Sequence, residues 1–156
     1  MAAATSEQLL VAVYTGDIPV RDPAESMEDR VAVVILRKFQ PALLDRYSPR
    51  AVIGDGNCCY RSASLGLYGV QDYHLRVRLL TAIEMLKHAQ LYDVNATDYS
   101  GGLDPGQMFV GTYGDLVDSV TTVGGFAELM HFYGISAAMG MICKTIVVIN
   151  VTMKIR

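Results

Sequence analysis

A short glycine-containing loop that runs directly into a pair of cysteines constrains this chain more than any other feature. Residues 54–62 read Gly-Asp-Gly-Asn-Cys-Cys-Tyr-Arg-Ser, and an apolar stretch follows that ends before Gly69. The pattern predicts a loop over residues 48–57 and a helix over residues 58–67. Unpaired amides at a helix N-terminus favour negative charge, such as a thiolate or an oxyanion. Cys58 is therefore either a nucleophile or a cysteine that packs as a small apolar residue.

Composition limits what kind of protein surrounds this loop. The chain has 156 residues, of which 51% are hydrophobic, which fits one domain with a substantial core. Its net charge of −3 argues against a broad nucleic-acid footprint, which would need clustered Lys and Arg. The most apolar stretch, residues 132–151, is interrupted by Lys144, so we expect no membrane span.

The cysteines favour a reducing compartment. There are three, Cys58, Cys59 and Cys143, and two of them are neighbours in sequence, which does not suit a disulfide framework. Their spacing also lacks the paired ligands of a zinc site, so we expect neither a metal nor another cofactor. The N-terminus has no signal-peptide pattern, and we expect an intracellular, cytoplasmic protein.

The first part of the chain divides into a lead-in and a helix. Residues 1–24 are broken by prolines and read as irregular. Residues 26–29 resemble a helix start, with acids in the first turn. Residues 31–36 are mostly β-branched and fit a strand, but the charged continuation favours a helix that bends at Pro41.

The second part predicts several helices and one strand. Residues 72–91 form the clearest helix, with Arg78 pointing away from a face that carries Leu75, Leu79, Ala82, Ile83, Leu86 and Ala89. Residues 93–107 read as an exposed loop. Short helices are expected at 113–120 and 125–133, and the β-branched run at 145–149 predicts a buried strand.

Residues 55–62 closely resemble the signature of the ovarian tumour (OTU) family of cysteine proteases, which reads Asp-Gly-Asn-Cys, an apolar residue, an aromatic, Arg, and Ser or Ala. The resemblance continues through residues 65–69 and through the start of the following helix. Residues 124–129 resemble a later Gly-Gly block of the family, with Val123 where a tryptophan usually stands. The similarity covers roughly residues 50–150.

The resemblance implies an α/β, papain-like fold, with helices around a small central β-sheet, in an OTU-like domain over residues 25–156. It implies a deubiquitinase, a thiol hydrolase that cleaves (iso)peptide bonds to ubiquitin or a ubiquitin-like protein. Cys58 takes the nucleophile position and Asp55 is grouped with it as catalytic, while Asp55 and the backbone amides of Gly56, Asn57 and Cys58 shape the oxyanion loop. Arg61 is expected to hold the helix start, and Cys59 is expected to pack inward.

The family's general-base histidine has no counterpart in this sequence. In the family it follows the central strand, whereas here no histidine follows His131. The chain ends soon after residues 145–149, so we expect the domain to be incomplete at its C-terminus, with final strands missing. His74, His88 and His131 fit ordinary helix histidines at or near the surface better than a substitute base.

Three interpretations therefore remain open. The first is an OTU-type deubiquitinase domain whose hydrolysis is impaired because the base is absent. The second is a catalytically inactive module that binds ubiquitin or another protein through the same face. The third is a plain α/β domain with a structural cysteine. The sequence gives no oligomeric state.

Overall fold

The computed structural model describes residues 22, 26–101 and 111–140. Their elements are the helices α2 (Arg30–Phe39), α3 (Cys58–Tyr68), α4 (His74–Lys87), α5 (Ala89–Tyr92), α6 (Tyr113–Thr121) and α7 (Leu129–Met139), with a short 3-10 helix η2 (Pro41–Leu43). The predicted lead-in, apart from Asp22, and the predicted strand at 145–149 lie outside the described residues, as does Cys143.

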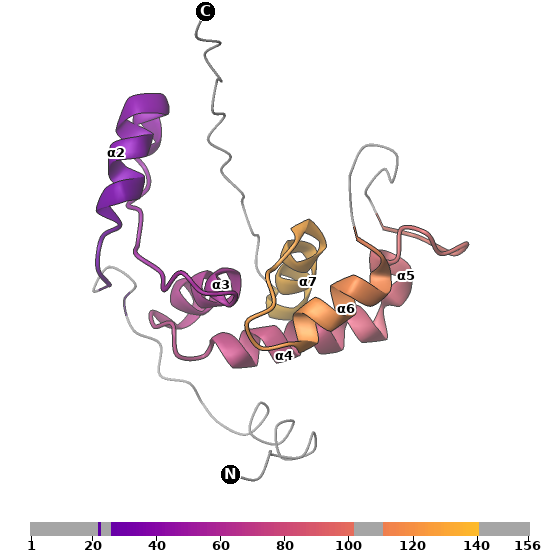
Figure 1. The fold of residues 1–156 in the computed structure, drawn as a ribbon. Coiled ribbons are helices and arrows are strands. Elements are labelled where there is room, and N and C mark those ends of the chain that lie inside the picture. The colour runs from indigo at the N-terminus through magenta and orange to yellow at the C-terminus, as the bar shows by residue number, and fades with distance from the viewer. Residues whose placement is uncertain (1–21, 23–25, 102–110, 141–156) are drawn as a thin grey trace, which may run out of the picture.

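Helix α4 is the centre of the described fold. It packs against α3, α6 and α7, and Figure 1 shows it running beneath all three, with α2 standing apart. The core between these helices consists of apolar side chains that are almost fully buried: Tyr60, Ala63, Val77, Ala82, Met85, Tyr92, Leu116, Val120, Met130 and Ile135. Helix-on-helix burial of this kind is the main stabilising contribution to such a domain.

The expectation of an α/β, papain-like fold with a central sheet is wrong for the part of the chain that is described. Those residues contain no β-strand, and their sole β-type pairing is an isolated bridge between Glu28 and Arg50. The β-branched run 31–36 lies within α2, where the Asp29 side chain caps the helix by accepting from the Ala32 amide at 2.9 Å. Helices therefore supply the whole of the described core.

The predicted ends of the helices are confirmed where a local signal sets them. Helix α3 begins at Cys58 and ends at Gly69, which has a φ of 74° that favours glycine. At Pro41, where a bend within one helix was expected, helix α2 has instead already ended at Phe39 and a separate 3-10 helix begins, because proline cannot continue the helical hydrogen bonding. The predicted long helix over 72–91 is instead α4 followed by α5, with a break at His88.

The predicted buried face of α4 is wrong. Leu75 and Leu86 are 47% and 54% exposed, and of the six apolar positions only Ala82 is fully buried. The face that enters the core passes instead through Val77, Arg78, Thr81, Ala82 and Met85. It is rotated from the predicted one because α4 contacts helices on several sides and buries an arginine in the middle of the bundle.

Candidate functional site

The loop before Cys58 is built around the carboxylate of Asp55. Arg61, one turn into α3, donates from Nη2 to Asp55 Oδ2 at 2.9 Å and from Nε to both carboxylate oxygens at 3.1 and 3.2 Å. The backbone amide of Asn57 donates to Asp55 Oδ1 at 2.9 Å. Arg61 thus holds the helix start through a polar contact, as predicted, and Asp55 joins the loop to the first turn of α3.

These contacts stabilise the charged form of Asp55. Hydrogen bonding from Arg61 is the largest cause, and with hydrogen bonding from Asn57 it outweighs partial desolvation and lowers the pKa of Asp55 to about 2. The side chain is still 34% exposed, so the pair is partly solvated. The carboxylate is therefore ionised at neutral pH and serves as an acceptor within the loop.

Replacing Asp55 with asparagine is expected to remove part of the acid sensitivity of the fold. Because the folded pKa of about 2 lies below the usual 3.8, Asp55 contributes stability that is present above pH 3.8 and is lost as pH falls toward 2. Urea unfolding across this window measures the effect. Arg61→Met is the matched variant and should reduce the pH dependence of the free energy of unfolding over the same range. Equal acid sensitivity in Asp55→Asn and the unmodified chain would contradict the assignment.

Cys58 is the first residue of α3 and carries a free, half-buried thiol. Its amide donates to the Asp55 carbonyl at 3.0 Å, and the Asn57 amide is held by the Asp55 carboxylate. Two of the amides predicted to shape an oxyanion loop are thus bonded within the loop. An oxyanion that bound them would have to displace the oxygens of Asp55. Cys59 packs against the core, as expected.

The loop contacts the segment between α6 and α7 very closely. Asn57, which is 6% exposed, accepts a hydrogen bond on Oδ1 from the Gly124 amide at 3.0 Å. A Cβ placed on Gly56 would lie 1.6 Å from the Gly124 carbonyl oxygen, so only glycine fits there. Gly124 itself has a φ of 86°, in the left-handed region. The fold therefore brings together two segments that are 67 residues apart in sequence.

Arg78 of α4 contacts both the Cys58 loop and the segment between α6 and α7. This role was not identified from the sequence. The buried Arg78 guanidinium donates from Nη2 to the Gly56 carbonyl at 3.0 Å and the Gly125 carbonyl at 2.7 Å. From Nη1 it donates to the carbonyls of Ser119 and Thr122 at 2.7 and 2.8 Å. Its predicted outward orientation is wrong. Arg78 shares a helix face with Ala82 and Met85, four and seven residues later, and this spacing was the sequence signal that could have placed it in the core.

The arginine is held in place by an aromatic ring. The guanidinium carbon lies 4.0 Å from the centroid of the Tyr60 ring, within cation–π range. Burial lowers the pKa of Arg78 and raises that of Tyr60. A cation at this depth is tolerated because the carbonyl oxygens of Gly56, Ser119, Thr122 and Gly125 are directed at it. Arg78, held by Tyr60, thus supports the Cys58 loop from the core side.

The chain's three histidines are engaged elsewhere. His74 Nδ1 accepts from Arg61 Nη1 at 3.1 Å, and His88 Nδ1 lies 3.0 Å from the Glu84 carboxylate. His131 is fully buried, which corrects the expectation of a surface residue. Its Nδ1 accepts from the Glu128 amide at 2.7 Å, which leaves Nε2–H to donate to the Leu116 carbonyl at 2.9 Å. Burial lowers the pKa of His131, so it stays neutral.

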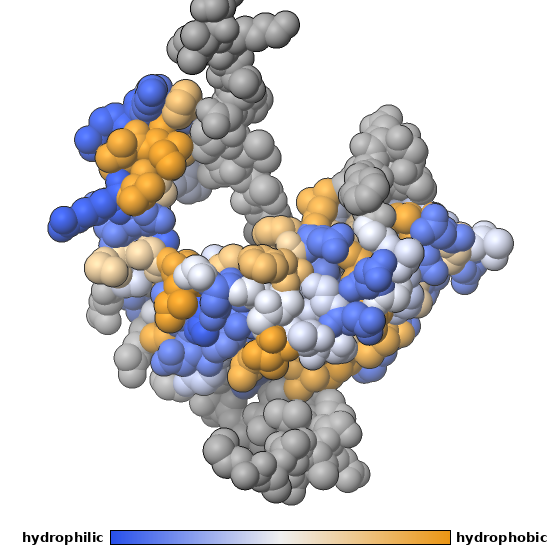
Figure 2. Space-filling view, in the orientation of Figure 1, coloured by the Kyte–Doolittle hydropathy of each residue, from blue (hydrophilic) through white to orange (hydrophobic). Residues whose placement is uncertain are grey.

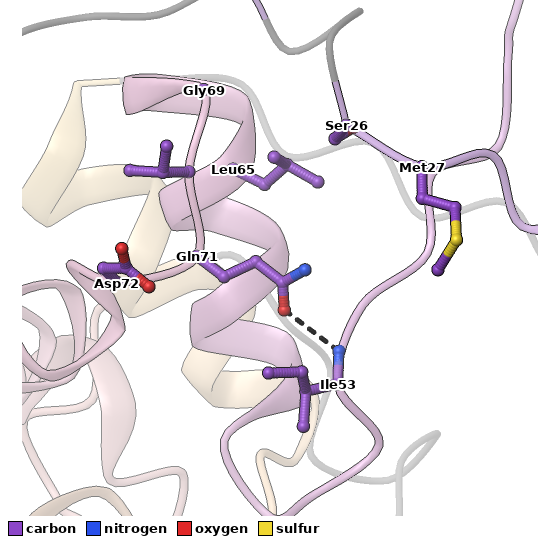
Figure 3. Close-up of a pocket in the computed structure, with 8 residues that line it drawn as sticks. Ser26, Met27, Ile53, Leu65, Gly69, Gln71 and Asp72 are labelled. Carbon is purple, nitrogen blue, oxygen red and sulfur yellow. Dashed lines mark hydrogen bonds between the residues drawn. The ribbon is translucent and has the colours of Figure 1, made fainter.

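A cavity of about 400 Å³ lies toward the other end of α3. Figure 3 shows Met27 and Ile53 facing Leu65 across it, with Gln71 at its edge. The Gln71 side chain accepts from the Ile53 amide at 3.0 Å and donates to the Ala51 carbonyl at 3.1 Å. Cys58, at the start of α3, is not among the residues that line it.

The described residues contain no cluster of three or more His, Cys, Asp or Glu side chains that could hold a metal ion. None of the helices in that part of the chain combines the length and the apolar character needed to cross a membrane.

Comparison with known proteins supports the resemblance over part of the chain. Residues 49–110 match the family model described as "Vertnin, OTU domain". The match covers under half of the 156 residues; it includes the Asp55–Cys58 loop and α4 but stops before Gly124. No match was found among curated proteins or among solved structures. The OTU-type character of residues 49–110 is thus confirmed.

Proposed function

We propose that the OTU-type domain containing residues 49–110 recognises ubiquitin or a ubiquitin-like protein inside the cell, through the face that carries the Cys58 loop. In this proposal the 156 residues bind the partner and do not hydrolyse its conjugates efficiently. The observation that carries it is the combination of a rigidly braced loop at the start of α3 with three histidines that all have other partners.

The argument against efficient hydrolysis rests on the need for a base. A cysteine hydrolase requires a group that takes the thiol proton and returns it to the leaving amine. His131 has both ring nitrogens bonded to backbone groups inside the core. His74 Nδ1 accepts from Arg61, and His88 lies at the far end of α4 beside Glu84. Among the described residues none of the three histidines forms a hydrogen bond with the Cys58 thiol, so none is placed as its base.

The argument for recognition rests on how firmly the loop is held. Asp55, Asn57 and Gly56 fix the loop to α3, to Gly124 and to Arg78. A surface that is ordered before binding loses little conformational freedom when a partner docks. The loop therefore suits a binding face even where Cys58 performs no chemistry.

A second candidate function is a thiol hydrolase that receives its base from outside these 156 residues. The half-buried, free thiol of Cys58 at the first position of α3 favours this candidate. It differs from the first in one respect, because it requires Cys58 for activity, whereas recognition does not.

Replacing Cys58 with alanine is expected to leave ubiquitin binding unchanged within about twofold, because the loop is held by Asp55, Asn57 and Arg78 and not by the thiol. Calorimetric titration of ubiquitin into both proteins measures this. A fluorogenic ubiquitin C-terminal amide should be turned over by neither, with Cys59→Ala as the matched control. Failure of both proteins to bind would contradict recognition. Turnover that vanishes in Cys58→Ala would support the hydrolase instead.

A further inference from the structure

Helix α2 carries an uncovered apolar stripe. Val31, Ile35 and Phe39 follow one another at a spacing of four residues and are 70%, 40% and 43% exposed. Val34 beside them is 64% exposed. Figure 2 shows the result as a hydrophobic area over α2 that is bordered by hydrophilic side chains. This stripe lies far from Arg78 and the helical core.

Such a helix needs a partner to be stable. It has ten residues, and isolated helices shorter than about 12–15 residues are marginal in water. None of its residues is buried, and η2 is the one described element with which it has extensive contacts. The residues just before α2 pair with the loop that precedes α3, where the Asp29 amide donates to the Pro49 carbonyl at 3.0 Å. We therefore expect another surface to cover the stripe.

The charges on α2 define that surface. Arg30, Arg37 and Lys38 are exposed around the stripe, and Lys38 Nζ lies 5.3 Å from the centroid of the Phe39 ring. Residues 30–39 contain no acidic side chain. A complementary surface is consequently apolar at its centre and acidic at its border.

Exposed apolar and acidic residues of the same chain lie on α6, α7 and the segment between them. Val123, Phe126 and Leu129 are 66%, 73% and 40% exposed, and Asp118 and Glu128 are exposed beside them in sequence. Ser119 donates to the Phe126 carbonyl, which holds this segment against α6. Residues 111–140 contain three acids and no lysine or arginine. We call these five exposed residues the acidic-apolar surface.

We propose that α2 of one copy of this chain docks its Val31–Ile35–Phe39 stripe on the acidic-apolar surface of a second copy. Within one molecule α2 stands apart from both α6 and α7 (Figure 1). Two copies that exchange α2 reciprocally satisfy both surfaces and close as a dimer with two-fold symmetry. The contact does not involve Cys58 itself, but its surface adjoins the Cys58 loop, because Gly124 lies between Val123 and Phe126 and donates to Asn57; the contact is therefore tested without ubiquitin.

Complementary charge reversal tests this contact. In Arg37→Glu/Lys38→Glu, α2 becomes acidic and faces an acidic surface, whereas in Asp118→Lys a basic α2 faces a surface that has exchanged an acid for a cation. Glu128 is left unchanged because its side chain accepts from the His131 amide and caps α7. Each variant alone should associate at least about tenfold more weakly than the unmodified chain, because like charges meet in both contacts. In an equimolar mixture each α2 again meets the opposite charge, and association should return.

Sedimentation velocity over a concentration series gives the readout, without ubiquitin present. Leu86→Ser, at an exposed position of α4, is the control and should associate like the unmodified chain. An unmodified chain that stays monomeric at about 100 µM would overturn the proposal, since a second copy would then bind too weakly to stabilise α2. A mixture of the two reversed variants that remains monomeric would overturn it as well.

Discussion

Replacing Arg78 with methionine is expected to lower the free energy of unfolding by about 3–5 kcal/mol. The guanidinium is 3% exposed and donates to carbonyls of Gly56, Ser119, Thr122 and Gly125. Methionine fills a similar volume but donates nothing, so these buried acceptors lose their partner. Urea denaturation followed by circular dichroism measures the loss.

Two variants separate the network from the loss of a charge. Arg46→Met removes an arginine from the exposed surface beyond η2 and should change stability by less than about 0.5 kcal/mol. Arg78→Lys keeps the charge but cannot direct a planar fork at several carbonyls, so we expect an intermediate loss. A stability of Arg78→Met equal to that of Arg46→Met would show that the carbonyls find other partners, and would remove Arg78 as the support of the loop.

The elements that the sequence predicts well are those with local end signals. Gly69 ends α3 as predicted, and the irregularity expected at Pro41 is present, although as the end of α2 and not as a bend; each residue acts through its own conformation or hydrogen bonding. The charged residues that follow 31–36 correctly favoured a helix over a strand. In all three cases the deciding interaction spans only a few residues, which is why the pattern alone suffices.

The features that the sequence predicts poorly depend on packing between distant segments. The central sheet was inferred from the resemblance and from residues 145–149, and the described part of the chain has none. The buried face of α4 was read from apolar spacing, which placed Leu75 and Leu86 inside and Arg78 outside. The buried face of α4 is determined by three neighbouring helices and by the carbonyl groups around Arg78. Neither can be recognised from the spacing of apolar residues in the sequence.

The candidate site divides in the same way. The sequence indicated the contact of Arg61 at the helix start and placed Cys58 in the first turn of α3, since both lie within a few residues of the loop. It did not indicate the bond between Asn57 and Gly124 or the contacts of Arg78, because their partners are 22 to 67 residues away. The sequence placed Gly56 in the loop but did not indicate Gly124 as its neighbour.

Replacing Gly56 with alanine is expected to destabilise the chain by about 3 kcal/mol or more and to disorder the Cys58 loop. The new methyl group would lie 1.6 Å from the carbonyl oxygen and 2.3 Å from the carbonyl carbon of Gly124. Both obstacles are backbone atoms, so no side-chain rotation relieves the contact. Separating the segments would also weaken the hydrogen bonds of Asn57 to Gly124 and of Arg78 to Gly56.

Gly54, two residues earlier in the same loop, provides the matched control. A Cβ there meets no atom within 4 Å, and its φ is not in the left-handed region. Gly54→Ala should therefore be neutral or stabilising by up to about 1 kcal/mol, since alanine reduces the freedom of the unfolded chain. Thermal melts of both variants, with amide hydrogen exchange of residues 55–58, measure the difference. If Gly56→Ala has the same melting temperature and the same amide hydrogen exchange as Gly54→Ala, the loop does not contact Gly124 as described. The face proposed for ubiquitin then loses its support.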